Sequence, residues 1–401
     1  MESSHRPLTV CHLITSSGAG GAERQLCALI AASEPQQVHH RVICLGEPGE
    51  MAGALEAAGA AVTHLGLAPR PWHLWRAVRR VRALLRAEEP DLLQSWLYHA
   101  DLVAALAAGR RAVVWTLRCA DMDLSRYRGT TRLVLRACVA LSRRPRAIVA
   151  NSRAGRHWHQ GLGYPAERLR VIPNGFDLQR FRPDPQARTR VRAELGVRED
   201  QLLVGRVARD DPMKDLPTFL DAARLAARRR PELCFLLVGR GMEPEAPVAR
   251  AFRQPPLAGR CFLVGHQEEV APWLAAMDLH LSSSRSEGLP NAVGEAMACG
   301  VPNLVTDAGD SAYLVGDTGR VVPPGQPFAL ASALEEMARL PREELRRLGR
   351  AARRRIAEHF SLPAMAGAYL ALYREILSTS SRSTTRGQER PVQERHTSST
   401  S

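Results

Sequence analysis

The sequence predicts an α/β protein that contains two doubly wound parallel sheets. Two observations lead to this fold class. Short apolar runs alternate with helical stretches along most of the chain, and a polar segment with prolines interrupts the alternation near the middle. Strands separated by helices pair in parallel, because the helix carries the chain back to the same end of the sheet.

The first alternation of strands and helices ends near Gly175. Its strand-like runs lie at 8–15, 41–46, 61–67, 91–96, 112–118, 147–152 and 169–175. Helical stretches lie between them at 22–32, 50–58, 72–88, 99–108, 130–142 and 153–161. Ligands bind such sheets beyond the carboxyl ends of the strands, so the loops that leave those ends are where we expect chemistry.

A second alternation begins after the polar segment DLQRFRPDPQARTR. Its strand-like runs lie at 202–208, 233–239, 260–265, 279–283, 303–306 and 319–324, and a helical pattern follows from Pro327. We therefore predict α/β domains at 1–175 and 201–358, a linker at 176–200, a helix at 359–378 that packs back toward the first domain, and a disordered polar tail at 379–401. A cleft between two such domains is a favoured ligand site.

The segment 282–307, SSSRSEGLPNAVGEAMACGVPNLVTD, carries the strongest local signal. It follows a strand-like run, Pro290 suits the first turn of a helix, and Gly300 suits its C-terminal cap. Glu287 then lies on the strand-to-helix loop and Glu295 one to two turns into the helix. The backbone N–H groups that open this helix can hold a phosphate, and the carboxylates suit hydroxyls of a sugar and a ribose. Either glutamate alone also fits an ordinary exposed residue.

Lys214 is the one lysine among 55 basic residues, in the segment GRVARDDPMKD between a strand-like run and a helix. An ammonium is a compact point charge that binds phosphate, whereas arginine is a planar fork, so the two are not interchangeable. The alternative is a surface lysine placed there by chance.

The segment that carries both glutamates resembles the E-x7-E signature of retaining glycosyltransferases of family 4. That signature commonly reads S-x-x-E-G-x-P-x-x-x-x-E-A-M-A-x-G-x-P-x-x-x-T in a two-domain fold termed GT-B. This chain supplies Ser284, Glu287, Gly288, Pro290, Glu295, Ala296, Met297, Ala298, Gly300, Pro302 and Thr306. The resemblance implies two Rossmann-like domains that face a central cleft, with the acceptor on the N-terminal side and the nucleotide sugar on the C-terminal side.

The resemblance also implies roles for individual residues. Glu287 would contact hydroxyls of the donor sugar and Glu295 the ribose. Arg206 and Lys214 would stabilise the leaving diphosphate, as catalytic residues together with Glu287. The remaining donor-side positions are Gly20, Gly21, Gly265, His266 and the backbone of Pro290, Asn291 and Ala292.

The acceptor side is less well defined by the sequence. By resemblance, His99 and Asp101 of YHAD are acceptor contacts, with helix capping as the alternative for Asp101. Arg118 and Cys119 fall where many family members have a histidine beside the transferring sugar. Arg118 could hold the acceptor or a phosphate, whereas Cys119 is better explained as a buried small hydrophobe. Asn174, Gly175 and Asp177 resemble the strand between the domains.

The function implied is a metal-independent, retaining glycosyltransferase of hexosyltransferase type. It would move a sugar from a UDP- or GDP-sugar to a hydroxyl of a glycan or lipid-linked acceptor, in polysaccharide or lipopolysaccharide synthesis. We expect no cofactor and no metal ligands. Three alternatives stay open: a sugar-nucleotide epimerase of related fold, a basic nucleic-acid-binding protein, and a non-catalytic partner subunit.

Charge and cysteine content bear on the surroundings of the protein. Of the net charge of +14, residues 1–175 contribute +10, from 23 Arg and 13 acidic side chains. Such an excess could attract an anionic membrane, although basic helix faces are commonly just solvated, and we expect no nucleic acid partner. The eight cysteines form no C-x-x-C pair, and no signal peptide is visible. We therefore expect a cytoplasmic protein, with the inner face of the cytoplasmic membrane as an alternative location.

Overall fold

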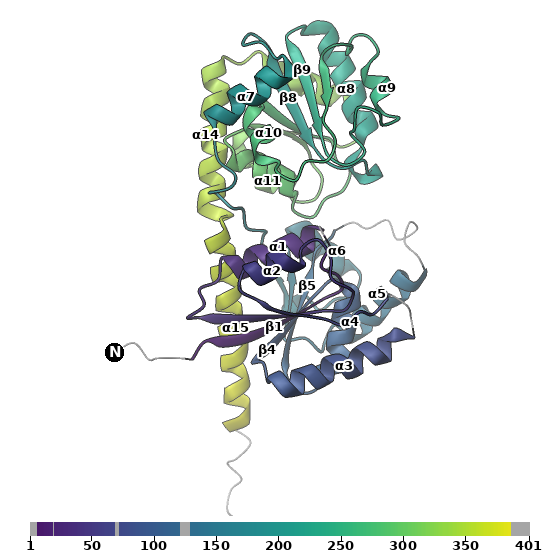
Figure 1. Ribbon diagram of the computed structural model, residues 1–401, viewed down its shortest axis with the longest axis vertical. Coiled ribbons are helices and arrows are strands. Elements are labelled where there is room, and N and C mark those ends of the chain that lie inside the picture. Colours follow the sequence, from purple (N-terminus) through teal and green to yellow (C-terminus); the bar gives the residue numbers. More distant parts are fainter. Residues whose placement is uncertain (1–5, 19, 69–71, 121–128, 386–401) are drawn as a thin grey trace, which may run out of the picture.

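The computed structural model describes residues 6–18, 20–68, 72–120 and 129–385. These residues form two lobes, and two successive helices run along one side of the molecule, Arg342–His359 (α14) beside one lobe and Leu362–Thr385 (α15) beside the other (Figure 1). Each lobe is built around one parallel sheet, and helices cover both faces of each sheet.

The N-terminal sheet contains seven described strands in the order β3-β2-β1-β4-β5-β6-β7, all parallel. Their bounds are Leu8–Ile14 (β1), Val38–Cys44 (β2), Ala61–His64 (β3), Leu92–Trp96 (β4), Ala112–Leu117 (β5), Ala147–Ala150 (β6) and Leu169–Val171 (β7). The helices are Gly21–Ala31 (α1), Ala52–Ala57 (α2), His73–Glu88 (α3), Tyr98–Ala107 (α4), Gly129–Leu141 (α5) and Arg153–Gly161 (α6). Each strand-like run expected in this half corresponds to a strand, and six of the seven end earlier than expected where the loop begins, whereas β4 ends at Trp96 as expected.

The C-terminal sheet contains six described strands in the order β10-β9-β8-β11-β12-β13, also all parallel. The strands are Leu202–Val207 (β8), Leu233–Val238 (β9), Cys261–Leu263 (β10), Leu279–Ser282 (β11), Asn303–Thr306 (β12) and Arg320–Val322 (β13). The helices are Pro185–Leu195 (α7), Leu216–Arg229 (α8), Ala249–Phe252 (α9), Ala271–Ala276 (α10), Asn291–Ala298 (α11), Ser311–Val315 (α12), Pro327–Ala338 (α13) and Arg342–His359 (α14).

The strand order places the functional loops. The order reverses between β1 and β4 in the first sheet and between β8 and β11 in the second. At such a reversal the loops leave in opposite directions and open a crevice at the carboxyl ends of the strands. The glycine loop follows β1, the Lys214 segment follows β8 and the Glu287 segment follows β11. Three of the predicted site segments therefore lie at switch points.

The chain crosses between the lobes at two neighbouring places. The backbone N–H of Phe176 donates to the carbonyl of Phe360 (2.8 Å), and Phe176 also forms an isolated parallel bridge with Ser361. After this second crossing, α15 (Leu362–Thr385) returns to the N-terminal lobe (Figure 1). There it buries an apolar stripe against α1 and the sheet, made of Met365, Tyr369, Leu372, Tyr373 and Ile376.

Two of the expected segment assignments differ from the structure. The range 176–200 contains α7, which packs against α10 in the C-terminal lobe. Asp184 caps this helix, Pro185 opens it and Gly196 ends it in the left-handed region, so local helix signals were present within a segment whose polarity suggested a linker.

The predicted tail also differs in part. The helix α15 continues to Thr385, so residues 379–385 are helical rather than disordered, because a helix docked along most of its length propagates into a polar end. The remainder of the predicted tail, 386–401, lies outside the described residues.

Two glycines inside helices give a matched test of the interface beneath α11. A Cβ on Gly349 of α14 would lie 1.9 Å from the carbonyl oxygen of Gly300, whereas a Cβ on Gly367 of α15 meets no atom within 4 Å. We expect Gly349→Ala to lower the free energy of unfolding by about 1–3 kcal/mol through overpacking. Gly367→Ala should raise it by about 0.5–1 kcal/mol, because alanine favours helix. Urea denaturation measures both, and a destabilising Gly367→Ala with a neutral Gly349→Ala would contradict the packing described.

Candidate functional site

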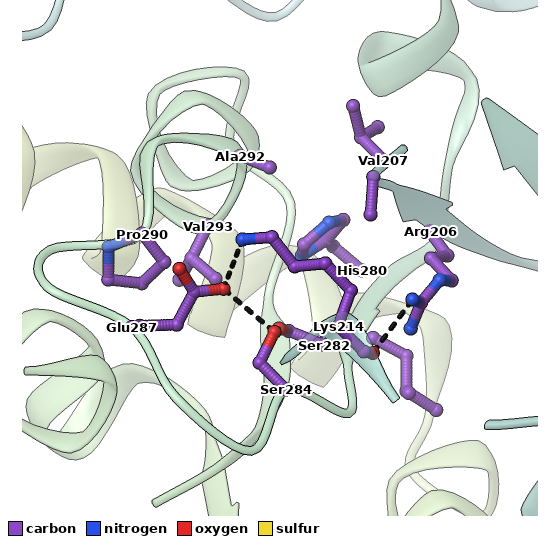
Figure 2. Close-up of a pocket in the computed structure, with 12 residues that line it drawn as sticks. Arg206, Val207, Lys214, His280, Ser282, Ser284, Glu287, Pro290, Ala292 and Val293 are labelled. Atoms are coloured by element: carbon purple, nitrogen blue, oxygen red, sulfur yellow. Dashed lines mark hydrogen bonds and ion pairs between the residues drawn. The ribbon is translucent and has the colours of Figure 1, made fainter. Parts of the chain in front are cut away.

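A pocket at the carboxyl edge of the C-terminal sheet gathers side chains from β8, β11 and α11 (Figure 2). The residues that line it are Arg206, Val207, Ala208, Lys214, His280, Leu281, Ser282, Ser284, Glu287, Pro290, Ala292 and Val293. The predicted residues Arg206, Lys214, Glu287, Pro290 and Ala292 therefore share one pocket.

Lys214 and Glu287 form an ion pair inside this pocket. The ammonium Nζ of Lys214 lies 2.5 Å from Oε1 of Glu287, and both side chains are mostly buried (Figure 2). The hydroxyl of Ser284 donates to the same carboxylate oxygen (2.7 Å). Oε1 thus has two partners, which leaves Oε2 as an acceptor that a ligand hydroxyl can use.

Arg206 reaches the pocket from β8 but is almost fully buried. Its guanidinium donates to Ser283 Oγ (2.6 Å) and to the backbone carbonyl of Lys214 (2.7 Å). Burial lowers the pKa of Arg206 to about 10, against the raising effect of Glu287, so the guanidinium is charged at neutral pH. The side chain fixes the turn that presents Lys214 and places a second positive charge beside it.

Lys214 lies on a short turn that is flanked by two capping aspartates. Residues Pro212–Lys214 form a 3-10 turn capped by Asp211, whose carboxylate accepts from Met213 N (2.9 Å). Asp215 follows with φ +46 and caps α8 through Thr218. Burial opposes ionisation of Asp215, but bonds from Thr218 and Arg285 lower its pKa overall.

His280 is a pocket residue that the sequence did not single out. Its Nδ1 lies 2.6 Å from Oδ1 of Asn303, whose own amide donates to Val301, so Nδ1 carries the proton. Nε2 is buried without a partner among the described residues. Burial lowers the pKa of His280 to about 4, and Arg206 contributes. The sequence did not identify His280 as a pocket residue, because a histidine between apolar residues of a strand also fits a core position.

The N-termini of two helices face each other across the lobes. Asn291 is the first residue of α11 and Gly21 is the first residue of α1. A Cβ on Gly21 would lie 3.8 Å from Nδ2, the side-chain amide nitrogen, of Asn291. Gly20 is the N-cap of α1, and the Glu23 carboxylate folds back over it. Both helix ends carry partial positive charge, so an anion between them would be stabilised by both.

A chain of hydrogen bonds links the two lobes beside these helix ends. Arg118 donates to Oδ1 of Asn174 (2.7 Å), and the amide of Asn174 donates to Oδ1 of Asn291 (2.7 Å). Gly175, the next residue, donates from its backbone to Gln25 (3.2 Å) and packs against Leu362. Asn174 and Gly175 thus connect the lobes, and Arg118 contacts this connection, while its acceptor or phosphate contact stays a prediction.

Other donor-side residues lie near the same sheet edge but outside the pocket. Glu295 is half-buried on α11, and burial raises its pKa while the charges of Arg24 and Arg180 lower it. Gly265 has φ +68 and pairs through its backbone with Gly239 and Met242, and His266 beside it is exposed. These residues do not line the pocket around Lys214 in the described part of the chain.

Of the four acceptor-side residues, one is exposed, one is buried, and Arg118 and Cys119 are half-buried. His99 is exposed on α4, whereas Asp101 is completely buried and accepts a hydrogen bond from Ser95 (2.6 Å). Burial raises the pKa of Asp101 well above its usual value. The carboxylate does not cap α4, because the N-cap of that helix is Leu97 and no side chain caps it, so the capping alternative is wrong, and the acceptor role of Asp101 stays a prediction.

Cys119 belongs to a hydrogen-bonded cluster at the end of β5. The hydroxyl of Tyr98 lies 3.1 Å from Cys119 Sγ and 2.7 Å from His159 Nε2. His159 Nδ1 lies 2.6 Å from the carbonyl of Gly155, which fixes the proton on Nδ1. Burial raises the pKa of the Cys119 thiol to about 11. The thiol therefore stays protonated at neutral pH, and its place beside the acceptor stays a prediction.

Two further searches cover only the described residues. Within them, no three His, Cys, Asp or Glu side chains gather as a set of metal ligands. None of the helices formed by these residues combines the length and apolar character that crossing a membrane requires.

The fold and the pocket define a class of protein. Two facing Rossmann-like sheets of parallel strands are the GT-B architecture, and HepE of Anabaena, crystallised in complex with UDP, shares it with a TM-score of 0.77. That alignment covers 94% of this chain and 100% of HepE at 23% identity, which establishes similarity of fold.

The sequence comparisons name the family. Residues 19–180 match the family model described as Glycosyltransferase Family 4, and residues 198–339 match the one described as Glycosyl transferases group 1. The chain belongs to glycosyltransferase family 4, as its sequence signature predicted.

Among curated relatives, the lipopolysaccharide core biosynthesis mannosyltransferase LpsB of Rhizobium meliloti is 27% identical over 77% of this chain and 81% of its own length. The putative glycosyltransferase EpsF of Bacillus subtilis is 31% identical over 39% of this chain and 40% of its own length. The match thus spans less than half of EpsF and most of LpsB.

The buried His280 predicts a pH-dependent stability. Its pKa is about 4 in the folded chain against 6.5 for an ordinary histidine, so the unfolded chain binds the proton first as pH falls. The stability contribution is present above pH 6.5 and is lost toward pH 4. We expect His280→Asn to reduce the pH slope of the unfolding free energy between pH 6 and 5 by about 1.4 kcal/mol per pH unit.

Urea titrations at several pH values measure this slope. The exposed His157 gives a control variant, His157→Asn, which should leave the slope unchanged. An unaltered slope in His280→Asn would contradict the assignment.

Proposed function

We propose that this protein is a metal-independent, retaining glycosyltransferase that moves a hexose from a nucleotide sugar to a hydroxyl of a glycan or lipid-linked acceptor. The observation that carries the proposal is the Lys214–Glu287 ion pair. It shares one pocket with Arg206 of β8 and with the first residues of α11. The pocket therefore offers cations and helix N–H groups for a diphosphate, and a carboxylate for sugar hydroxyls.

The chemistry follows from where charge develops. When the bond between the anomeric carbon and the diphosphate breaks, negative charge grows on the leaving phosphate. Lys214 and the start of α11 are fixed before the reaction, so they stabilise this charge without reorganising. In the proposed same-face attack, the acceptor hydroxyl gives its proton to the leaving phosphate, and Glu287 holds the sugar in place through its hydroxyls.

The other predicted donor contacts are part of the proposal. Gly20 and Gly21 would approach the diphosphate from the opposite lobe, and Glu295 would bind the ribose. Gly265 and His266 would lie against the base. Their location at the carboxyl edges of the two sheets supports these roles.

The donor remains to be identified by experiment. HepE has been crystallised with UDP-glucose, and LpsB is described as a mannosyltransferase, so the base and the sugar both need testing. A thermal-shift panel of UDP-, GDP- and ADP-sugars, each with glucose or mannose, would identify the nucleotide that raises the Tm.

Replacing the lysine tests the catalytic proposal. With the donor found by that panel, we expect Lys214→Ala to lower kcat by a hundredfold or more, roughly the loss seen when one oxyanion-stabilising group is removed. Arg209→Ala is the matched control, since this nearby arginine is exposed and pairs with Asp211, and its kcat should stay within about threefold. Rates are measured by nucleotide release with and without EDTA, which should have no effect. Undiminished turnover in Lys214→Ala would refute the role of the lysine.

We also propose that the protein works at the cytoplasmic face of an anionic membrane. Trp72 and Trp75 at the start of α3 and Leu133 on α5 are each 67% exposed. Exposed arginines flank them on both helices, namely Arg76, Arg79, Arg132 and Arg136. Apolar side chains among cations suit a surface of anionic lipid, and α3, α4 and α5 contact one another in series over one face of the sheet.

Vesicle binding tests this surface. We expect the wild type to co-sediment with phosphatidylglycerol vesicles and to be released by salt, because screening weakens charge attraction. The double variant Trp72→Ala with Trp75→Ala should bind at least about tenfold more weakly, since each buried indole contributes on the order of 1 kcal/mol or more. Phe328→Ala is the control, as Phe328 is 76% exposed but lies on the other lobe. Equal binding by all three proteins would exclude this surface.

A further inference from the structure

The two lobes are joined by a contact that lies outside the pocket. The carboxylate of Asp310 accepts hydrogen bonds from the backbone N–H groups of Arg153 (2.6 Å) and Ala154 (2.8 Å). Arg153 and Ala154 open α6 in the N-terminal lobe, whereas Asp310 precedes α12 in the C-terminal lobe. Asp310 is only 4% exposed, so the carboxylate is enclosed between the lobes.

The direction of this side chain is informative. Asp310 is the N-cap of α12, where an aspartate commonly accepts from the N–H groups of its own helix. Here the side chain makes no cap bond to α12 and caps α6 of the other lobe instead. Ser152 caps α6 by accepting from Gly155 (2.9 Å), so Asp310 satisfies the first two N–H donors and Ser152 the third. The positive end of the α6 dipole adds to the attraction.

A second contact between the same two helices supports the first. The guanidinium of Arg153 lies 3.7 Å from the centre of the Tyr313 ring on α12. This is the geometry of a cation–π interaction. The start of α6 and the start of α12 are therefore held together by both backbone and side chain.

The Asp310 loop also supports the loop that carries Glu287. The backbone N–H of Asp310 donates to the carbonyl of Gly288 (2.9 Å). Gly309 has φ +58, and a Cβ there would lie 2.1 Å from the carbonyl oxygen of Glu287, so the two loops touch backbone to backbone. A shift of Asp310 must therefore move the Glu287 loop with it.

We propose that Asp310 is a positioning residue, in a role that rests on the proposed function: its carboxylate latches the lobes in the closed arrangement and thereby holds Glu287 where the donor sugar reacts. When the lobes separate, the carboxylate and the two N–H groups return to water. Closure replaces that water with two charge-assisted hydrogen bonds, which form only in the closed state. Lys214 lies on the same lobe as Glu287, so most of the proposed donor contacts remain when the lobes separate and only those of Gly20 and Gly21 are lost, whereas transfer needs the closed lobes.

Removing the carboxylate separates these effects. We expect Asp310→Ala to increase the radius of gyration measured by small-angle X-ray scattering. Its kcat should fall by about 10- to 100-fold, the loss expected from a charge-assisted hydrogen bond, while the Kd for the nucleotide sugar changes far less. Asp307→Ala is the matched control, because Asp307 is an exposed carboxylate in the same loop, and it should match the wild type in all three measurements.

A second pair of variants breaks the bond from the other lobe. Arg153→Pro removes one of the two donated N–H groups at the first position of α6, where proline is favoured. Ser152 before it is extended, at φ −153 and ψ 156, as a residue preceding proline prefers. Arg153→Ala removes the guanidinium but keeps the N–H. We expect Arg153→Pro to open the lobes and lower kcat more than Arg153→Ala does.

The outcomes are distinct. If Asp310→Ala and Arg153→Pro both keep the radius of gyration of the wild type, the latch is refuted. If the lobes open but kcat is unchanged, the link to Glu287 is refuted. A wild type that transfers sugar from no donor refutes the proposed function instead, and the scattering comparison still decides the latch.

Discussion

The ion pair between Lys214 and Glu287 is the interaction on which the arrangement of the pocket depends. It joins the loop after β8 to the loop after β11, across 73 positions of sequence. A mostly buried pair such as this gains attraction but also loses hydration, so by itself it is a poor stabiliser of a fold. The surrounding contacts serve to hold its geometry. Arg206 binds the carbonyl of Lys214, and Ser284 binds the carboxylate of Glu287.

The topology explains why these residues meet. Parallel strands present all their carboxyl ends at one edge, and the reversal of strand order opens a crevice at that edge. The loops beside this reversal lead into helices that begin at the same edge of the sheet, α1 in the first lobe and α8 and α11 in the second. The double crossing at Phe176 and Ser361 then brings the two edges face to face, and α15 fastens the second crossing to the N-terminal core.

Much of this could be predicted from the sequence, because apolar runs, turns and helix ends are encoded locally. The thirteen described strands fall on the predicted runs, Gly300 follows the end of α11 as expected, and Pro290 is the N-cap of α11 instead of a residue of its first turn. What the sequence did not reveal depends on contacts between distant segments. The burial of Asp101 and the inward direction of Arg206 result from packing within each lobe. The bonds of Asn174 and Asp310 result from how the lobes dock, and no local pattern records that. The helix α7 is a different case. Its Asp-Pro start and its Gly end are local helix signals, but the polarity of the segment favoured a linker.

A crystal structure with an intact nucleotide sugar is the most direct test of the central claim, that cations of the C-terminal lobe hold a diphosphate while Glu287 holds the sugar. We expect a phosphate oxygen at about 3 Å from Nζ of Lys214 and from the first N–H groups of α11, with a sugar hydroxyl bonded to Glu287. A diphosphate bound away from the start of α11, with the Lys214–Glu287 pair facing only solvent, would contradict it.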